Sequence, residues 1–134
     1  MTPIYTFNEA QLQQLYRLYQ QEWWTGERSL EDTRRVVSGS QITIGLLDDD
    51  ELVGFTRVLT DFTFKALIFD VIVSASHRDK GLGSRLIQLV KTHPELQQVR
   101  HFELYCLPEL EPFYQRQGFS DDVAGTRLLR WVKI

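Results

Sequence analysis

The stretch from Ser74 to Ser84 holds the densest set of residues able to bind an anion. An apolar run precedes it, a helical pattern follows it, and Gly81 and Gly83 stand where the two meet. A helix start leaves backbone N–H groups without partners and carries partial positive charge, and glycines let a phosphate approach the backbone closely. Arg78 and Lys80 add positive charge. The pattern favours a pyrophosphate-binding turn; the alternative is that the glycines only permit a tight turn.

This turn departs from two common nucleotide-binding motifs. It contains no G-x-x-x-x-G-K-[ST] for a nucleoside triphosphate, and it lacks the third glycine of a dinucleotide-binding G-x-G-x-x-G. A different ligand that carries a pyrophosphate is therefore expected.

The spacing of apolar residues predicts the elements that position the turn. Two helices are expected at residues 8–22 and 29–39, each opened by a capping pair, and two more are expected after residue 81 and at residues 109–117. Strands are expected at residues 41–47, 52–59, 66–73, 102–107 and 127–134, the last with Trp131 in the core. The order α-α-β-β-β-α-β-α-β predicts an α/β fold with a mixed sheet covered by helices.

Length and composition narrow the functional classes. The 134 residues suit a single domain, 1–134, and 43% hydrophobic with 25% charged residues is typical of a globular protein. A net charge of −3 disfavours nucleic acid as a partner, and no apolar stretch reaches membrane-spanning length. The single cysteine, Cys106, and the absence of zinc-ligand spacing predict neither a disulfide nor a metal site. We expect a cytoplasmic protein that does not bind membranes.

Two motifs make the chain resemble the GNAT superfamily of acyltransferases. Residues 78–83, Arg-Asp-Lys-Gly-Leu-Gly, match the family's acyl-CoA loop, Arg/Gln-x-x-Gly-x-Gly/Ala, between a strand and a helix. Residues 114–119 are similar to its Y-x-x-x-G-F signature, and the order of elements agrees over most of the chain. Ala75 stands where the family often has proline, which changes the rigidity of the turn.

The resemblance implies that acetyl-CoA is the co-substrate and that the acceptor is the primary amine of a small molecule. Strand 66–73 and strand 102–107 would separate, with the pantetheine arm between them and a backbone N–H at Val71 or Ile72 polarising the thioester carbonyl. A homodimer is compatible with this fold. The cofactor-binding residues implied are Val71, Ile72, Val73, Arg78, Asp79, Lys80, Gly81, Leu82, Gly83 and Ser84.

Amide formation also needs a proton donor and a proton acceptor. Tyr114 occupies the position at which the family commonly places its general acid, and a phenol with a pKa of about 10 suits protonation of a thiolate; the alternative is core packing beside Phe113. The candidate bases are Asp70, Glu103 and Asp61, and we take Asp70 as the catalytic residue.

Trp23 and Trp24 fall where the N-terminal helices of this family line the acceptor pocket. With Phe55 and Asp61 they are expected to form an aromatic and acidic site for a cationic amine. The alternative is that both tryptophans pack in the core. Two other functions stay open: acetylation of a protein or peptide amine, and acyl-CoA binding without catalysis.

Overall fold

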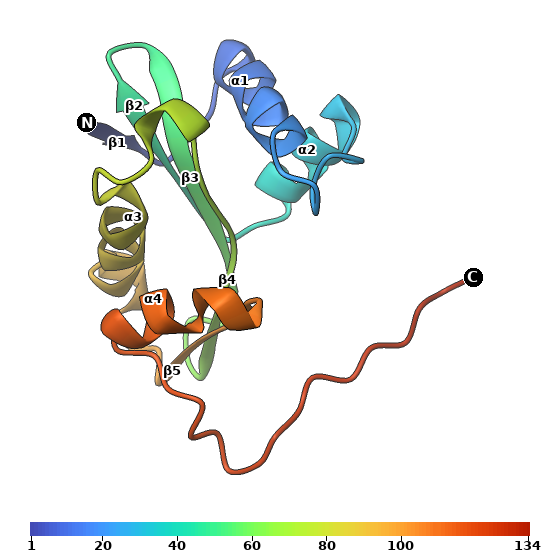
Figure 1. Ribbon diagram of the computed structural model, residues 1–134, viewed down its shortest axis with the longest axis vertical. Helices are drawn as coiled ribbons and strands as arrows, with labels where there is room; N and C mark the ends of the chain where they lie inside the picture. Colours follow the sequence, from blue (N-terminus) through green and yellow to red (C-terminus); the bar gives the residue numbers. More distant parts are fainter.

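A five-stranded sheet forms the centre of the computed structural model, which describes residues 1–134. Its strands lie in the order β1-β2-β3-β4-β5 (Figure 1), antiparallel except for the parallel pair β4 and β5. This is the mixed, mostly antiparallel sheet expected. The strands are β1 (Thr2–Ile4), β2 (Ile42–Asp48), β3 (Glu51–Thr60), β4 (Lys65–Val73) and β5 (His101–Leu104).

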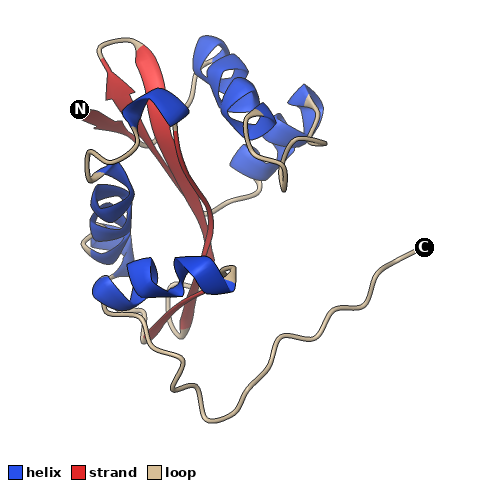
Figure 2. Ribbon diagram, in the orientation of Figure 1, coloured by secondary structure: helices blue, strands red, loops and turns tan.

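Helices cover both faces of this sheet (Figure 2). On one face lie α1 (Glu9–Gln20) and α2 (Leu30–Ser38), and on the other lies α3 (Leu82–Lys91), while α4 (Glu111–Arg116) follows β5. Three single turns of 3-10 helix, Ala75–His77, Pro94–Leu96 and Pro108–Leu110, connect these elements. None of the helices has the length and apolar character that a membrane span requires.

The first two helices begin where the sequence predicts. Asn8 and Gln11 form a complete capping box at α1, and Ser29 and Asp32 form another at α2, so the N-cap and N3 N–H groups of both helices are bound. Gly39 ends α2, as expected.

The core divides between the two faces of the sheet. On the α3 face, Leu86, Ile87 and Val90 pack against β2, β3 and β4, while on the α1 face Leu15 and Tyr19 pack against Phe55 and other strand residues. Each amphipathic helix thus buries one apolar stripe against the sheet.

Two elements differ from the sequence prediction. The short edge strand β1 pairs with β2 and was not expected, because three residues carry too little periodicity to be recognised. The strand expected at residues 127–134 is not part of the sheet: the segment is extended but unpaired, and Trp131 is 86% exposed instead of lying in the core. Apolar alternation indicated a strand but could not show which edge it would join.

Candidate active site

The parallel strands β4 and β5 separate partway along their length. They pair from Lys65 with His101 to Ile68 with Leu104, and the last five residues of β4 continue without a partner on that side. A strand edge without a partner presents N–H and C=O groups to whatever lies beside it. The pairing of β4 with β5 thus ends before Val71, Ile72 and Val73, the residues expected to bind the pantetheine arm.

A bulge lies at the point where the strands separate. The register of β3 with β4 shifts between Phe55 and Arg57, and Asp70 has a φ of 56°, a left-handed conformation that Asp adopts more readily than most residues. A one-residue shift turns side chains to the other face of a sheet, so Ile68 packs in the core on the α3 side and Ile72 in the core on the α1 side.

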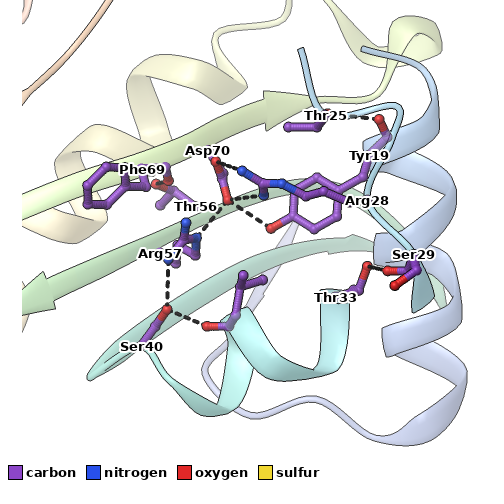
Figure 3. Close-up of polar contacts among 11 residues, drawn as sticks. Tyr19, Thr25, Arg28, Ser29, Thr33, Ser40, Thr56, Arg57, Phe69 and Asp70 are labelled. Atoms are coloured by element: carbon purple, nitrogen blue, oxygen red, sulfur yellow. Dashed lines mark hydrogen bonds and ion pairs between the residues drawn. The ribbon is translucent and has the colours of Figure 1, made fainter. Parts of the chain in front are cut away.

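The Asp70 carboxylate at this bulge is bound on all sides (Figure 3). It accepts hydrogen bonds from Tyr19 Oη (2.9 Å), Arg57 Nε (2.7 Å) and Arg28 Nη1 and Nη2 (2.6 and 3.2 Å). Its side chain is only 4% exposed. Burial alone would raise the pKa of Asp70, but the hydrogen bonds from Arg28 and Arg57 outweigh burial and lower the pKa below its usual value.

The turn that follows α1 is fastened to β4 on both sides of the tryptophans. Before them, Gln21 Nε2 donates to Val73 O (3.1 Å) and Gln21 Oε1 accepts from Ala75 N (3.3 Å). After them, Arg28 binds Asp70. Trp23 and Trp24 are 79% and 42% exposed, so they do not pack in the core. The structure thus binds the turn that carries the two exposed tryptophans to the unpaired end of β4.

The start of α3 is open to an anion. Unlike α1 and α2, this helix has no capping side chain, and the N–H groups of Leu82, Gly83 and Ser84 have no acceptor. The N-cap residue Gly81 has a φ of 76°, and nothing lies within 4 Å of the place where a Cβ would stand. A helix start with free N–H groups and open space fits a phosphate group.

The charged side chains around this turn differ in whether another residue of the protein already binds them. Lys80 is exposed and makes no ion pair, whereas Arg78 is held by Glu22 (2.6 Å) and lies 3.4 Å from Val73 O. The buried His77 lies 2.9 Å from Asp48 Oδ2 and fixes the start of the loop to the end of β2. Asp79 is exposed with a φ of 64°.

The helix α4 is joined directly to the start of α3. A Cβ at Gly83 would come within 3.2 Å of Phe113 Cζ, so glycine is needed here for close packing as well. Gln117 Nε2 donates to Ser84 Oγ (2.8 Å), and Lys91 Nζ donates to Gln117 O. These contacts fix the start of α3 relative to α4.

Tyr114 lies on α4 in a largely apolar setting. Its ring packs edge-on against Phe113 and Phe119, with centroids 4.9 and 6.1 Å away. Burial, with a smaller contribution from Cys106, raises the pKa of Tyr114 to about 12. Its hydroxyl makes no hydrogen bond within the protein. The phenol stays protonated at neutral pH and has a proton free to donate.

The structure does not bring the other predicted residues to this place. Phe55 has 0% exposure and packs against Phe7 and Tyr19, so a ligand cannot reach its side chain. Asp61 lies in the β3–β4 turn at the opposite end of β4, where its carboxylate accepts from the N–H groups of residues 63, 64 and 65. Glu103 pairs with Lys65 at that same end.

Arg28, Arg57 and Tyr19 were missed as members of the site. They lie 42, 13 and 51 residues from Asp70 in sequence, and no local motif connects them. A charged residue inside an otherwise apolar strand, Asp70 in residues 66–73, was the one available signal that buried partners had to exist.

Comparison with known proteins decides the family. The sequence profile of the Acetyltransferase (GNAT) family matches residues 7–119, which include the glycine turn before α3 and α4 itself. The chain belongs to the GNAT family of acetyltransferases. It is 30% identical over 129 residues to the uncharacterized N-acetyltransferase ycf52 of Pyropia yezoensis, an alignment that covers 90% of this chain and 71% of that protein.

Solved structures share the fold. A GNAT-family protein from Xanthomonas campestris pv. campestris superposes with a TM-score of 0.82 at 26% identity, covering 98% of this chain and 94% of the other. An aminoglycoside 6'-N-acetyltransferase in complex with coenzyme A superposes with a TM-score of 0.68 at 23% identity, covering 78% and 61% of the two chains. This GNAT protein therefore has the architecture of acetyltransferases throughout its helices and sheet.

Proposed function

We propose that this protein transfers the acetyl group of acetyl-CoA to a primary amine, of a small molecule, by direct attack. The observation that carries the proposal is the uncapped start of α3, which lies next to the unpaired end of β4 and is joined to the helix that holds Tyr114. Acetyl-CoA is a long substrate with a pyrophosphate at one end and a thioester at the other. A helix start for the pyrophosphate, a strand edge for the arm and an acid for the thioester, all held at fixed positions, suit such a substrate.

The chain supplies three kinds of contact to acetyl-CoA. The N–H groups at residues 82–84 and the Lys80 ammonium bind the pyrophosphate, and Arg78, Asp79 and Gly81 shape the loop around it. The edge of β4 at Val71, Ile72 and Val73 hydrogen-bonds the pantetheine arm as a neighbouring strand would. A backbone N–H at Val71 or Ile72, turned by the bulge at Asp70, polarises the thioester carbonyl.

Bound in this way, acetyl-CoA supplies a thioester whose acetyl carbon is attacked by the amine. The new N–C bond forms as the C–S bond breaks, and Tyr114 gives its proton to the departing sulfur. The amine nitrogen loses its extra proton to water. Tyr114 then recovers a proton from solvent.

Asp70 acts in this proposal by positioning rather than as a base. Its carboxylate is fully engaged and has a lowered pKa, and it links the bulge to Arg28 in the turn that carries the tryptophans. A carboxylate in that state is a poor proton acceptor. It is well suited to hold the β4 backbone and the acceptor side of the site together.

Trp23 and Trp24 form the acceptor side. Their exposure and the fastening of their turn to β4 by Gln21 and Arg28 support this placement. Indole faces attract a cationic amine before it loses its proton. The high exposure of Trp23 also favours one alternative, an amine on a peptide or protein, which needs an open surface.

The acceptor class is tested by incubating the protein and acetyl-CoA with aromatic amines, polyamines, amino acids and peptides, and identifying acetylated products by mass spectrometry. We expect acetylated small amines, with Trp24→Ala raising KM for the amine but not for acetyl-CoA. Acetylation of peptides alone would instead support the protein acceptor. Tight acetyl-CoA binding without any product would point to a non-catalytic module.

A further inference from the structure

Two arginines share one buried carboxylate where β4 leaves β5 (Figure 3). Asp70 accepts hydrogen bonds from both Arg28 and Arg57, and neither arginine forms an ion pair with any other carboxylate. The side chains of the two arginines are 26% and 13% exposed. Two positive charges therefore face one negative charge in a largely buried place. Because a buried charge without a counter-ion is costly, an anion that enters here is stabilised.

The two arginines use their N–H groups differently. Arg28 gives both Nη groups to Asp70, at 2.6 and 3.2 Å. Arg57 gives only Nε to Asp70, while its Nη1 lies a long 3.5 Å from Ser40 Oγ and its Nη2 makes no hydrogen bond. Every buried side-chain polar atom has a partner, so Nη2 of Arg57 reaches the surface. Arg57 therefore keeps donors, in a planar arrangement, for a second carboxylate.

The protein has room for an anion at the outer end of Arg57. Gly39 and Gln41, which flank Ser40 in sequence, line a hollow of about 430 Å³. Leu59 lines the same hollow and lies two residues beyond Arg57 on β3. Residues two apart on a strand share a face of the sheet, so the hollow opens on the face from which the Arg57 side chain projects.

Aromatic side chains connect Arg57 with the place where β4 and β5 separate. The guanidinium carbon of Arg57 lies 5.0 Å from the centroid of the Phe69 ring. Phe69 packs edge-on against Tyr105, with centroids 5.6 Å apart. Tyr105 is the first residue after β5 and is 53% exposed. An amine that lies along this aromatic pair has Arg57 at one end and the unpaired part of β4 at the other.

The spacing along β4 sets the length of such an amine. Arg57 pairs with Phe69, and Val71 and Ile72, the candidates for polarising the thioester, follow two and three residues later. At a rise of about 3.3 Å per residue, the two places are about 7 to 10 Å apart. An α-amino acid carries its amine and its carboxylate on one carbon and is too short to reach both. An ω-amino acid carries them at opposite ends of a chain and has the required length.

We propose that Arg57 binds a carboxylate of the acceptor, and that the acceptor is an ω-amino acid, an amine with its carboxylate at the far end of an aliphatic chain. This inference rests on the proposed acetyl transfer and names the class of amine. Arg57 selects the acceptor and takes no part in proton transfer. A site built to hydrogen-bond a charged group rejects a neutral analogue, which leaves the donors of the site unpaired.

The test compares ε-aminocaproate with its amide, two amines that have the same chain and differ in the charge at its far end. The wild type should show a kcat/KM about tenfold higher for the carboxylate, the size of one charge-assisted hydrogen bond, and the difference should lie mainly in KM. Arg57→Gln should abolish this preference, because it lowers kcat/KM for the carboxylate far more than for the amide.

Two further variants separate recognition of the anion from general damage to the cluster. Arg28→Gln is the matched control, because it also removes one positive charge beside Asp70, but both Nη groups of Arg28 are already bound. It should keep the preference for the carboxylate, whatever its effect on the overall rate. Arg57→Lys retains the charge without the planar donors and should restore part of the preference. Circular dichroism checks that all three variants are folded.

Calorimetry of the two amines, with CoA bound, separates this inference from the acetyl transfer. Binding that favours the carboxylate and loses this preference in Arg57→Gln, without any acetylated product, would support the anion site and contradict the proposed function. Equal kcat/KM values for the two amines, or a preference that survives Arg57→Gln, would overturn the anion site and leave acetyl transfer standing. A protein that neither binds nor acetylates ε-aminocaproate would overturn it as well.

Discussion

At the scale of single residues, the site depends on two groups whose protonation is fixed by their surroundings. Apolar packing raises the pKa of Tyr114 to about 12, and two arginines lower the pKa of Asp70. Near neutral pH the phenol is therefore a donor and the carboxylate an acceptor of hydrogen bonds. Neither group changes its protonation near neutral pH.

Tyr114→Phe is expected to lower kcat by about 100-fold or more, the usual contribution of a general acid. Acetyl-CoA affinity should be unchanged, because the hydroxyl makes no contact within the fold and the ring is kept. Steady-state kinetics and calorimetry measure the two effects. The matched control Tyr5→Phe removes a hydroxyl far from the site, beside His93. A kcat equal to that of the wild type would exclude Tyr114 as the acid.

Asp70→Asn is expected to lower the free energy of unfolding by about 3 kcal/mol at neutral pH, because removal of one partner leaves buried arginine charge uncompensated. Asn also adopts the left-handed conformation readily, so the substitution removes the charge without straining the backbone. The folded-state pKa of Asp70 is lowered, so its contribution is full above about pH 4, the unfolded value, and is lost as pH falls through the folded value.

The difference between wild type and Asp70→Asn should therefore shrink as the pH drops below about 4. Urea unfolding across pH measures it. Asp49→Asn is the matched control, since Asp49 is an exposed aspartate with a φ of 53°. A difference between wild type and Asp70→Asn that persists unchanged in acid would contradict the assignment.

At the scale of elements, the starts of the helices differ in how they are capped. In α1 and α2 the capping box binds the N3 and N-cap N–H groups, whereas α3 begins at a glycine and has no capping side chain. The sequence predicts this contrast, because side-chain caps are local and lie within four residues. Glycine is also needed at position 83 because Phe113 packs closely against it. The sequence could not predict this contact, because α3 and α4 are far apart in the chain and touch only after folding.

Lys80→Glu is expected to weaken acetyl-CoA binding by about tenfold, the size of one charge-assisted hydrogen bond. The effect should decrease as salt is added, because Lys80 is exposed. Titration calorimetry at two salt concentrations measures both. Arg100→Glu makes the same charge change beside Phe64, at the other end of β4, and should leave the affinity unchanged. Equal affinities for the two variants would remove Lys80 from the phosphate site.

The bulge in β4 shows where prediction from sequence stops. Alternation correctly placed Asp70 on the face opposite Val71 and Val73, but it gave no sign of the left-handed backbone or of Arg28 and Arg57. Those contacts join residues from β3, β4 and the turn before α2. A buried charge in a strand indicates that partners exist and does not identify them.

At the scale of the whole molecule, most of the fold follows from local patterns. Two capped helices, a hairpin, the β4–α3 turn and α4 lie within a few residues of their predicted positions. The exceptions are β1, which is too short to show a period, and residues 127–134, whose apolar alternation predicts a strand without showing which sheet edge it joins.

Two sets of contacts hold together the parts of the molecule that the proposed reaction uses. Turn 21–28, which carries the tryptophans, is bound to β4 through Gln21 and Arg28, and α4, which carries Tyr114, packs against α3 through Gln117 and Phe113. Positioning of two substrates is the main task of an enzyme that forms an amide from an activated thioester.

The rate of thiol release from acetyl-CoA, measured with and without a small primary amine, decides whether this protein is an amine acetyltransferase. We expect release that depends on the amine, saturates with it and equals the acetylated amine formed. Thiol release that is absent, or that proceeds equally without any amine, would contradict it.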